Sequence, residues 1–250
     1  MTTKILPMKD SLANYKIRKE ALFDLPMKCL IVGKSELSGK STMIGNLLLR
    51  PYDAEDVGGK EFYKGDFKGE NIYIVNPSLH LDDKWVNIVR AKRIPDGNIY
   101  IEFDEDLLTE LYKKLEEQYA EEVSQGKVHQ KLIIFDDCAY SGDLKSKNHG
   151  ILSKMIANGR HIALSTIITS QKYSSINTLV RENATALILF ESSAKQVELI
   201  AEDHAIQSKK DFEKMYRACT REKHSFMVIN YSNPIEARFM NCNFEPIQSK

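Results

Sequence analysis

Short apolar runs alternate with amphipathic segments along this chain. Runs of this kind that end at glycine, proline, asparagine or acidic residues predict buried strands of a mostly parallel sheet. The expected strands cover residues 29–32, 71–75, 98–103, 132–135, 162–168, 185–190, 225–230 and 237–240. The last two flank a turn at 232–234, which predicts a hairpin that closes the sheet.

The amphipathic segments between those runs predict helices. The clearest spans 104–122, where apolar residues recur at helical spacing and the opposite face is charged. Others are expected at 43–49, from 82 onward, and at 151–157, 174–180, 194–202 and 211–221. Residues 1–26 predict a loop or short strand on the sheet edge, and the glycine-rich stretch 51–70 predicts a surface excursion.

No internal repeat, low-complexity linker or change of composition divides the chain. Strands and helices that alternate without a break predict a single α/β domain over residues 1–250, with a mostly parallel central sheet flanked by helices. Its core is expected at about 25–190, followed by C-terminal helices and the hairpin over 191–250.

Candidate chemistry is concentrated between the first strand and the first helix, where the sequence reads Gly39-Lys40-Ser41-Thr42. Strand, glycine-containing loop, Gly-Lys-Ser and helix is the order of a phosphate-binding P-loop, in which backbone N–H groups and the positive end of a helix surround an anion. Lys40 is expected to reach the β- and γ-phosphates of ATP, and the Ser41 hydroxyl to ligate Mg²⁺. The expected binding residues are Gly33, Lys34, Ser35, Glu36, Leu37, Ser38, Gly39, Lys40, Ser41 and Thr42.

The spacing of this loop departs from the usual pattern. Five residues lie between Gly33 and Gly39, and the pattern is one residue shorter. Either one residue is inserted, or Lys34 occupies the position of the first glycine. Glu36 also brings a negative charge near the phosphates. The alternative is a chance Gly-Lys-Ser in an ordinary strand–loop–helix, but the strand and helix on either side favour the P-loop.

A second cluster of candidate chemistry follows the strand at 132–135. Asp136 and Asp137 stand at the carboxyl end of that strand, where open parallel sheets bind their ligands. An apolar run that ends in acids is the Walker B pattern. Asp136 is expected to hold Mg²⁺ directly or through water, and Asp137 to polarise the attacking water as general base.

Alone, the same pattern is equally typical of a buried strand with a solvated pair of acids, but the upstream P-loop favours catalysis. The 96 positions from Lys40 to Asp136 favour P-loop ATPases with a strand between the P-loop strand and the Walker B strand. Gln171 follows the strand at 162–168, and a polar amide there is placed to sense a γ-phosphate. The alternative is that Ser170 caps the next helix.

Composition narrows the function classes. Of 250 residues, 42% are hydrophobic, which suffices for a sizeable core. Lys+Arg and Asp+Glu number 35 each, so the monomer is not a cationic nucleic-acid binder, and DNA contact must be local or arise when copies assemble. The four cysteines lack CxxC spacing, which argues against a zinc site or disulfide framework. No apolar run reaches transmembrane length and the polar N-terminus is no signal peptide, so we expect a soluble intracellular protein.

The ordered motifs resemble the viral genome-packaging ATPases of the FtsK–HerA superfamily, in the poxvirus-like branch found in large DNA viruses and virophages. The resemblance covers about 25–190. Many families share the P-loop, whereas Asn-Gly-Arg-His before a strand ending in Ser-Gln is more specific. The carrying residues are 29–42, 71–85, 132–137, Asn158-Gly-Arg-His161 leading into Ser165 and Gln171, and Arg181-Glu-Asn183. The resemblance implies a P-loop NTPase fold with a RecA-like (ASCE) core.

The resemblance also implies a mode of action. Family members hydrolyse ATP with Mg²⁺ as a ring homo-oligomer, here expected to be a pentamer or hexamer, and drive double-stranded DNA into a preformed capsid. The implied partners are DNA, further copies of the chain and a capsid vertex or portal protein, with no membrane. The implied location is the host cell cytoplasm or viral factory, or the virion.

Individual roles follow from the same resemblance. Gln171 maps to the sensor of the family's third motif. An arginine is expected to act on the ATP of the neighbouring subunit, and the candidates are Arg160 and Arg181. Arg160 ranks first because Asn-Gly-Arg-His follows the helix after Walker B. For either arginine the alternative is a surface or helix-capping salt bridge.

DNA contact is expected from Lys145, Lys147 and Lys154, which would face a central pore where a ring repeats each lysine. Such binding is mostly to phosphates and depends on salt. A solvated loop is the alternative. A second basic group is an outer helix face or a docking surface for the portal or capsid: Lys209, Lys210, Arg217, Arg221 and Lys223.

Two other functions stay open. A P-loop nucleotide or small-molecule kinase usually needs an arginine-rich lid, and the loop at 138–150 contains lysines but no arginine. The irregular P-loop also allows a non-catalytic ATP-binding scaffold.

Overall fold

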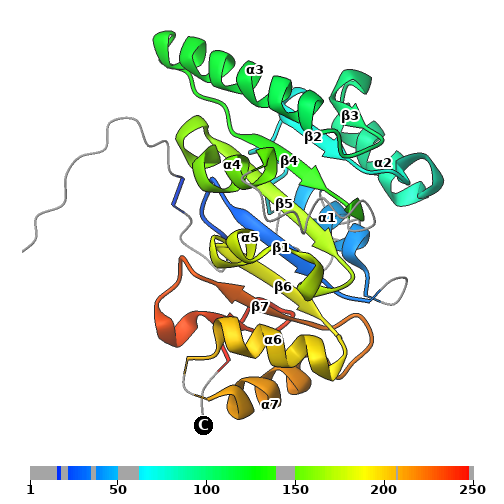
Figure 1. The fold of residues 1–250 in the computed structure, drawn as a ribbon, viewed down its shortest axis with the longest axis vertical. Coiled ribbons are helices and arrows are strands. Elements are labelled where there is room, and N and C mark those ends of the chain that lie inside the picture. The colour runs from blue at the N-terminus through cyan, green and yellow to red at the C-terminus, as the bar shows by residue number, and fades with distance from the viewer. Residues whose placement is uncertain are drawn as a thin grey trace, which may run out of the picture.

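The computed structural model describes residues 16–17, 22–34, 38–49, 62–138, 150–206 and 208–247. These residues form one eight-stranded sheet with helices on both faces (Figure 1). The strands are β1 (Lys28–Val32), β2 (Ile72–Val75), β3 (Ile99–Tyr100), β4 (Lys131–Phe135), β5 (Leu164–Ser170), β6 (Ala186–Phe190), β7 (Phe226–Asn230) and β8 (Phe239–Met240). The helices are α1 (Lys40–Leu48), α2 (Asp83–Lys92), α3 (Glu105–Ser124), α4 (Ile151–Asn158), α5 (Thr178–Glu182), α6 (Ala194–His204) and α7 (Lys209–Cys219).

The strand order is β3-β2-β4-β5-β1-β6-β7-β8. All neighbours from β3 to β6 pair in parallel, whereas β6 with β7 and β7 with β8 pair antiparallel. β5 lies between β1 and β4, as the spacing between Lys40 and Asp136 predicts. The predicted α/β fold class is therefore confirmed, and so is the C-terminal hairpin, formed by β7 and β8.

Strand alternation divides the interior into two cores. In β1, Leu30 and Val32 face one core, and Cys29 and Ile31 face the other. The first core is covered by α3 to α7 and the second by α1 and α2. Both faces of the parallel strands are thus buried, which explains why the strands read as continuous apolar runs in the sequence. Within the described ranges, no helix has the length and apolar character needed to cross a membrane.

Several elements differ in extent from their predictions. The strand expected at 98–103 shortens to β3, and the strand expected from 162 begins at Leu164. A 3-10 turn occupies Gly159–Ile162, and Ala163 then takes a φ of 55° before the chain extends. The helix expected at 174–180 is instead a 3-10 turn followed by α5, because the Asn177 side chain accepts a hydrogen bond from the Val180 N–H (2.8 Å) and starts a new helix.

The predicted surface excursion at 51–70 is wrong for Tyr63 and Phe67. Residues from 62 onward of this stretch are described. Both rings are buried, and the Tyr63 hydroxyl donates to the carbonyl of Phe23 (2.9 Å). A Cβ on Gly69 would lie 2.0 Å from the carbonyl oxygen of Lys92. The glycine at this position therefore permits close backbone packing against the end of α2.

Candidate nucleotide-binding site

The carboxyl ends of β1, β4 and β5 meet at one edge of the sheet. Val32 pairs with Ser170, and Phe135 pairs with Ile168. The residues that follow these strands are therefore neighbours in space although they are far apart in sequence. The register brings the loop after β1, the acids after β4 and Gln171 after β5 to the same edge, as the sequence predicts.

The loop between β1 and α1 is pressed against the sheet at Gly33. A Cβ there would lie 2.6 Å from Cβ of Phe190 and 2.7 Å from Cβ of Ser38, closer than real Cβ atoms approach other atoms. Gly39 takes a φ of 86°, which favours glycine, at the N-cap of α1. Because only glycine fits at Gly33, this residue is best taken as the first glycine of the P-loop pattern, with one residue inserted before Gly39. The alternative, in which Lys34 occupies the first-glycine position, is less favoured. Ser35, Glu36 and Leu37 lie outside the described residues.

Lys40 begins α1 and is buried. Its ammonium donates to the carbonyl of Gly33 (3.0 Å) and lies near Ser38 Oγ (3.5 Å). Burial lowers the pKa of Lys40, and the negative charges of Asp137 and Asp136 offset part of that effect. The arrangement places a partly desolvated positive charge beside the loop, where its attraction for an anion is stronger than in water.

The carboxylate of Asp136 is held by three donors from three different elements. Oδ2 accepts from the Trp85 indole N–H (2.6 Å) and from the Asn76 amide (3.0 Å). Oδ1 accepts from the Thr169 hydroxyl. Burial raises the pKa of Asp136, and the hydrogen bonds from Thr169 and Trp85 offset part of the rise. A carboxylate offers about four lone-pair sites, so these donors fix its orientation and leave room for a further partner.

Asp137 takes a φ of 54° immediately after β4. Its backbone N–H donates to Thr169 Oγ1 (3.2 Å), and its carboxylate accepts from the Gln171 side-chain amide (3.2 Å). The alternative prediction, that Ser170 caps the next helix, is wrong, because Lys172 precedes the 3-10 turn Tyr173–Ser175 as its N-cap. The Ser170 hydroxyl instead accepts from the Lys172 N–H (3.2 Å) in a local turn. The Gln171 amide and the second acid are therefore in direct contact.

These groups line a cavity of about 260 Å³. The lining residues come from the loop and α1, from the acids after β4, and from the segment between β2 and α2: Ser38, Gly39, Lys40, Ser41, Asn76, Ser78, Asp82, Lys84, Trp85, Asp136 and Asp137. A mixed set of hydroxyls, carboxylates and ammonium groups at the positive end of a helix suits a phosphate ester with a hard metal ion.

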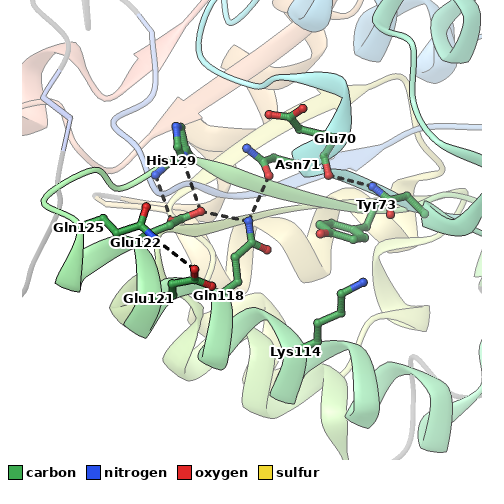
Figure 2. Close-up of a pocket in the computed structure, with 10 residues that line it drawn as sticks. Glu70, Asn71, Tyr73, Lys114, Gln118, Glu121, Glu122, Gln125 and His129 are labelled. Atoms are coloured by element: carbon green, nitrogen blue, oxygen red, sulfur yellow. Dashed lines mark hydrogen bonds and ion pairs between the residues drawn. The ribbon is translucent and has the colours of Figure 1, made fainter.

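A larger recess of about 410 Å³ opens between α3 and the start of β2 (Figure 2). The buried ammonium of Lys131 donates to Glu122 Oε2 (2.7 Å) near its floor, and the Gln118 amide donates to Glu122 Oε1 (3.0 Å). This recess contains none of the P-loop or Walker B residues, so the smaller cavity is the candidate nucleotide site.

The ion pair beneath the recess gives a test of stability. Glu122→Gln is expected to destabilise the fold by about 3 kcal/mol at pH 7, because it leaves the fully buried Lys131 ammonium without its charged partner. Burial raises the pKa of Glu122, but the hydrogen bonds from Lys131 and the His129 N–H outweigh this and hold it below its ordinary value. A depressed pKa stabilises the fold above the unfolded-state pKa, and this stabilisation is lost as the pH falls through the folded-state pKa. Urea unfolding should therefore show a difference that shrinks at acidic pH, and a constant difference would contradict the assignment.

The structure places the two candidate arginines in different surroundings. Arg160 is exposed in the turn before β5, at the opposite edge of the sheet from the P-loop. Burial and the nearby charge of Arg160 lower the pKa of Lys28, at the start of β1. Arg181 donates to Asp203 Oδ2 (2.7 Å) and lies over the Tyr173 ring (4.9 Å), with 11% of its side chain exposed. Arg181 therefore forms a salt bridge within its own chain, which is the alternative to a trans-acting role.

Lys154 contacts α3. Its ammonium lies 4.5 Å from the centre of the Tyr112 ring and 3.7 Å from Glu116 Oε1, and the side chain is half exposed. Lys145 and Lys147 lie outside the described residues. Contact of these lysines with DNA stays a prediction.

Comparison with known proteins decides the family. The family model described as Poxvirus A32 protein matches residues 94–243, which is more than half of the chain. The chain belongs to the poxvirus A32 protein family. The predicted resemblance to the poxvirus-like branch is therefore confirmed. The match includes β4 with its acids and Gln171 but not the P-loop, so the P-loop of this A32-family chain rests on its own residues and geometry.

Solved structures of genome-packaging proteins share the fold of this A32-family chain. The genome packaging NTPase B204 from Sulfolobus turreted icosahedral virus 2, in complex with ATP-gammaS, matches with a TM-score of 0.54 and 15% identity over 83% of this chain and 93% of that one. Its complex with AMP gives 0.53 and 16% over 82% and 92%. B204, the DNA-packaging ATPase from Sulfolobus Turreted Icosahedral Virus, gives 0.52 and 14% over 83% and 95%. A search of curated protein sequences returned no match.

Three residues of the site were not singled out from the A32-family sequence: Asn76, Trp85 and Thr169. Asn76 directly follows β2, and Thr169 is the penultimate residue of β5, so both stand at the ligand-binding edge. The rule that polar residues at the carboxyl ends of parallel strands approach the ligand could have identified these two. Trp85 gave no such signal, because its contact with Asp136 depends on how α2 packs against the sheet.

Proposed function

We propose that this chain is an ATP-hydrolysing motor that packages double-stranded viral DNA into a preformed capsid. The observation that carries the proposal is the convergence of Lys40, Asp137 and Gln171 at one edge of the sheet in a member of the poxvirus A32 family. Its fold is shared with a genome packaging NTPase whose structure was solved in complex with ATP-gammaS, which supports both the nucleotide and the task.

In this proposal the loop from Gly33 to Thr42 binds the triphosphate of ATP. Lys40 supplies positive charge to the β- and γ-phosphates, where negative charge develops during transfer. Asp137 accepts the proton of the attacking water. Gln171 donates a hydrogen bond to the Asp137 carboxylate and so orients that carboxylate and the water relative to the γ-phosphate. Hydrolysis then depends on positioning more than on covalent chemistry.

The donor set at this edge fits Mg²⁺. The described residues hold no cluster of three or more His, Cys, Asp or Glu that could bind a metal alone. Ser41 and Asp136 line the same cavity and are hard oxygen donors, and Mg²⁺ binds through one or two such groups together with phosphates and water. When bound, the ion would neutralise phosphate charge and orient the triphosphate.

The donors around Asp136 give a test of this assignment. Thr169→Val is expected to slow ATP hydrolysis roughly 10- to 100-fold, because groups that orient a metal-facing carboxylate matter nearly as much as the ligand. Valine keeps the shape but removes the bonds to Asp136 Oδ1 and from the Asp137 N–H. Hydrolysis measured against Mg²⁺ concentration should also show a higher Mg²⁺ requirement. Thr166→Val, three residues earlier on β5, is the matched control, and equal rates for the two variants would contradict the assignment.

The motor needs a ring whose neighbouring subunits complete each site. Arg160 is the favoured trans-acting arginine, because its guanidinium has no carboxylate partner among the described residues, whereas Arg181 would first have to leave Asp203. A pentamer or hexamer would repeat Lys145, Lys147 and Lys154 around a pore and so provide positive charge that the neutral monomer lacks. A capsid vertex or portal protein would hold this ring, and the site of action would be the viral factory or host cytoplasm.

ATP hydrolysis by the purified protein, with and without long double-stranded DNA, tests the proposal together with the oligomer mass. We expect an oligomer whose hydrolysis rises with DNA and falls as salt increases. Phosphate transfer to a nucleoside or nucleotide would identify a kinase instead. Bound nucleotide without hydrolysis by the assembled ring on DNA would identify a scaffold. A monomer that ignores DNA under all conditions would overturn the motor.

A further inference from the structure

The turn between α7 and β7 lies beside the P-loop. β7 runs antiparallel to β6, so its first residue, Phe226, pairs with the last residue of β6, Phe190. The turn that enters β7 therefore opens at the same edge of the sheet as the P-loop, whereas a parallel strand would begin at the opposite edge. Figure 1 shows β7 next to β6 on the side of the sheet away from β4.

His224 brings this turn into contact with the phosphate loop. A Cβ on Gly39 would lie 3.8 Å from Nδ1 of His224, so the imidazole faces the glycine that starts α1. His224 takes a φ of 65°, a conformation that few residue types adopt. Next to it, Lys34 of the loop is paired with Glu191, at the end of β6 (2.9 Å). Segments that follow β6 and precede β7 thus form the wall of the loop on this side.

The turn carries positive charge that no acid of the described residues pairs with. Arg221, Lys223 and His224 are all exposed, and the part of the chain that the structure describes gives none of their side chains an ion pair or hydrogen bond. Glu222 is the one acid within the turn, and it too is exposed. Two permanent cations and an imidazole beside a phosphate loop suit an anionic ligand with polar groups beyond its phosphates.

The position of the catalytic groups fixes which end of ATP reaches this turn. The γ-phosphate must lie toward Asp137 and Gln171, which follow β4 and β5 on one side of β1. A triphosphate that starts there and crosses the tip of β1 continues toward β6 and β7 on the other side. Its α-phosphate, ribose and base therefore approach His224.

We propose that the α7–β7 turn binds the nucleoside end of ATP, with His224 and Arg221 contacting the α-phosphate and ribose. This proposal rests on the proposed function, because it assumes that ATP occupies the P-loop. It also gives a role to part of the C-terminal basic group, for which the sequence suggested an outer helix face or a docking surface. The turn would then distinguish a nucleotide from a bare polyphosphate.

Calorimetric titration of the full-length protein with ATP and with inorganic tripolyphosphate tests this proposal. His224→Asn and Arg221→Gln are expected to weaken ATP binding roughly tenfold each, the loss of one charge-assisted contact, and to leave tripolyphosphate affinity nearly unchanged. Asparagine tolerates the left-handed conformation at this position, so the turn should keep its shape. Lys210→Ala, near the other end of α7, is the matched control for surface charge.

Each other outcome overturns a different statement. Equal losses for ATP and tripolyphosphate, or no loss for either, would overturn the nucleoside contact. A selective loss of ATP affinity in Lys84→Ala, with none in His224→Asn, would place the nucleoside on the α2 side of the cavity and overturn the proposal as well. Unchanged ATP and tripolyphosphate binding in Lys40→Ala would instead remove the P-loop itself, and with it the proposed function.

Discussion

Lys40→Ala is expected to abolish ATP hydrolysis and to weaken ATP binding at least roughly 100-fold. The Lys40 ammonium is buried against the Gly33 carbonyl, and burial lowers its pKa, so little water competes for its charge. Hydrogen bonds to charged groups contribute about 1.5–3 kcal/mol each, and one ammonium on the β- and γ-phosphates makes more than one. The fold should persist, because the change removes a buried cation that has no ion pair with a described residue.

Calorimetry and steady-state hydrolysis measure the effect of Lys40→Ala. Lys68→Ala is a suitable control, because Lys68 is exposed and its ion-pair partner, Glu70, is also exposed and 3.9 Å away. A surface ion pair of this length contributes little to stability. A variant at Lys40 that still hydrolyses ATP would show that the Gly-Lys-Ser sequence is not a working P-loop. Loss of ATP binding together with a lower unfolding midpoint would point to a structural role instead.

Asp137→Asn is expected to stop hydrolysis while ATP still binds. A general base contributes roughly 10²- to 10⁴-fold, and an amide cannot take the proton of the attacking water. The asparagine oxygen can still accept from Gln171, so the geometry after β4 should persist. Asp136→Asn makes an informative contrast. Its oxygen could still accept from Trp85 and Asn76, and its NH₂ could donate to the Thr169 hydroxyl, which also accepts. This variant should therefore keep its fold but lose the negative charge proposed to hold Mg²⁺.

Single-turnover hydrolysis and nucleotide binding separate the two acids. Binding without turnover in Asp137→Asn, at an unchanged unfolding midpoint, is the expected result. Turnover within a few-fold of the wild type would contradict the role of Asp137 as base and would favour an oxygen of the γ-phosphate or a solvent water as the group that receives the proton.

The fold was predictable because its strands are buried on both faces. Runs such as 132–135 are continuous and apolar, and each ends at a polar residue, a glycine or a proline. Asp136 ends the run at 132–135. The boundaries that changed lie where short-range hydrogen bonds prevailed over periodicity. The Asn177 side chain divides a predicted helix, and the left-handed Ala163 delays β5.

The site was predictable only in part. Lys40, Asp137 and Gln171 belong to sequence patterns, because their proposed roles require a fixed residue type at the start of α1 or next to a strand end. Trp85 and His224 belong to none. They reach the site through the packing of α2 and through the antiparallel course of β7, which depend on contacts between distant parts of the chain. The burial of Tyr63 and Phe67 also depends on distant contacts. The glycines of 51–70 indicate a flexible backbone, but they do not indicate whether the side chains between them are buried.

Trp85 is the only tryptophan of the chain. Its indole is fully buried and bonds to the carboxylate of Asp136. Intrinsic fluorescence excited at the red edge, where tyrosine does not absorb, therefore comes from a single ring at a known position. Any event that changes the charge or orientation of that carboxylate alters the surroundings of the emitting group. Trp85 fluorescence therefore reports on the Asp136 carboxylate, and we expect it to follow nucleotide binding in real time without a label.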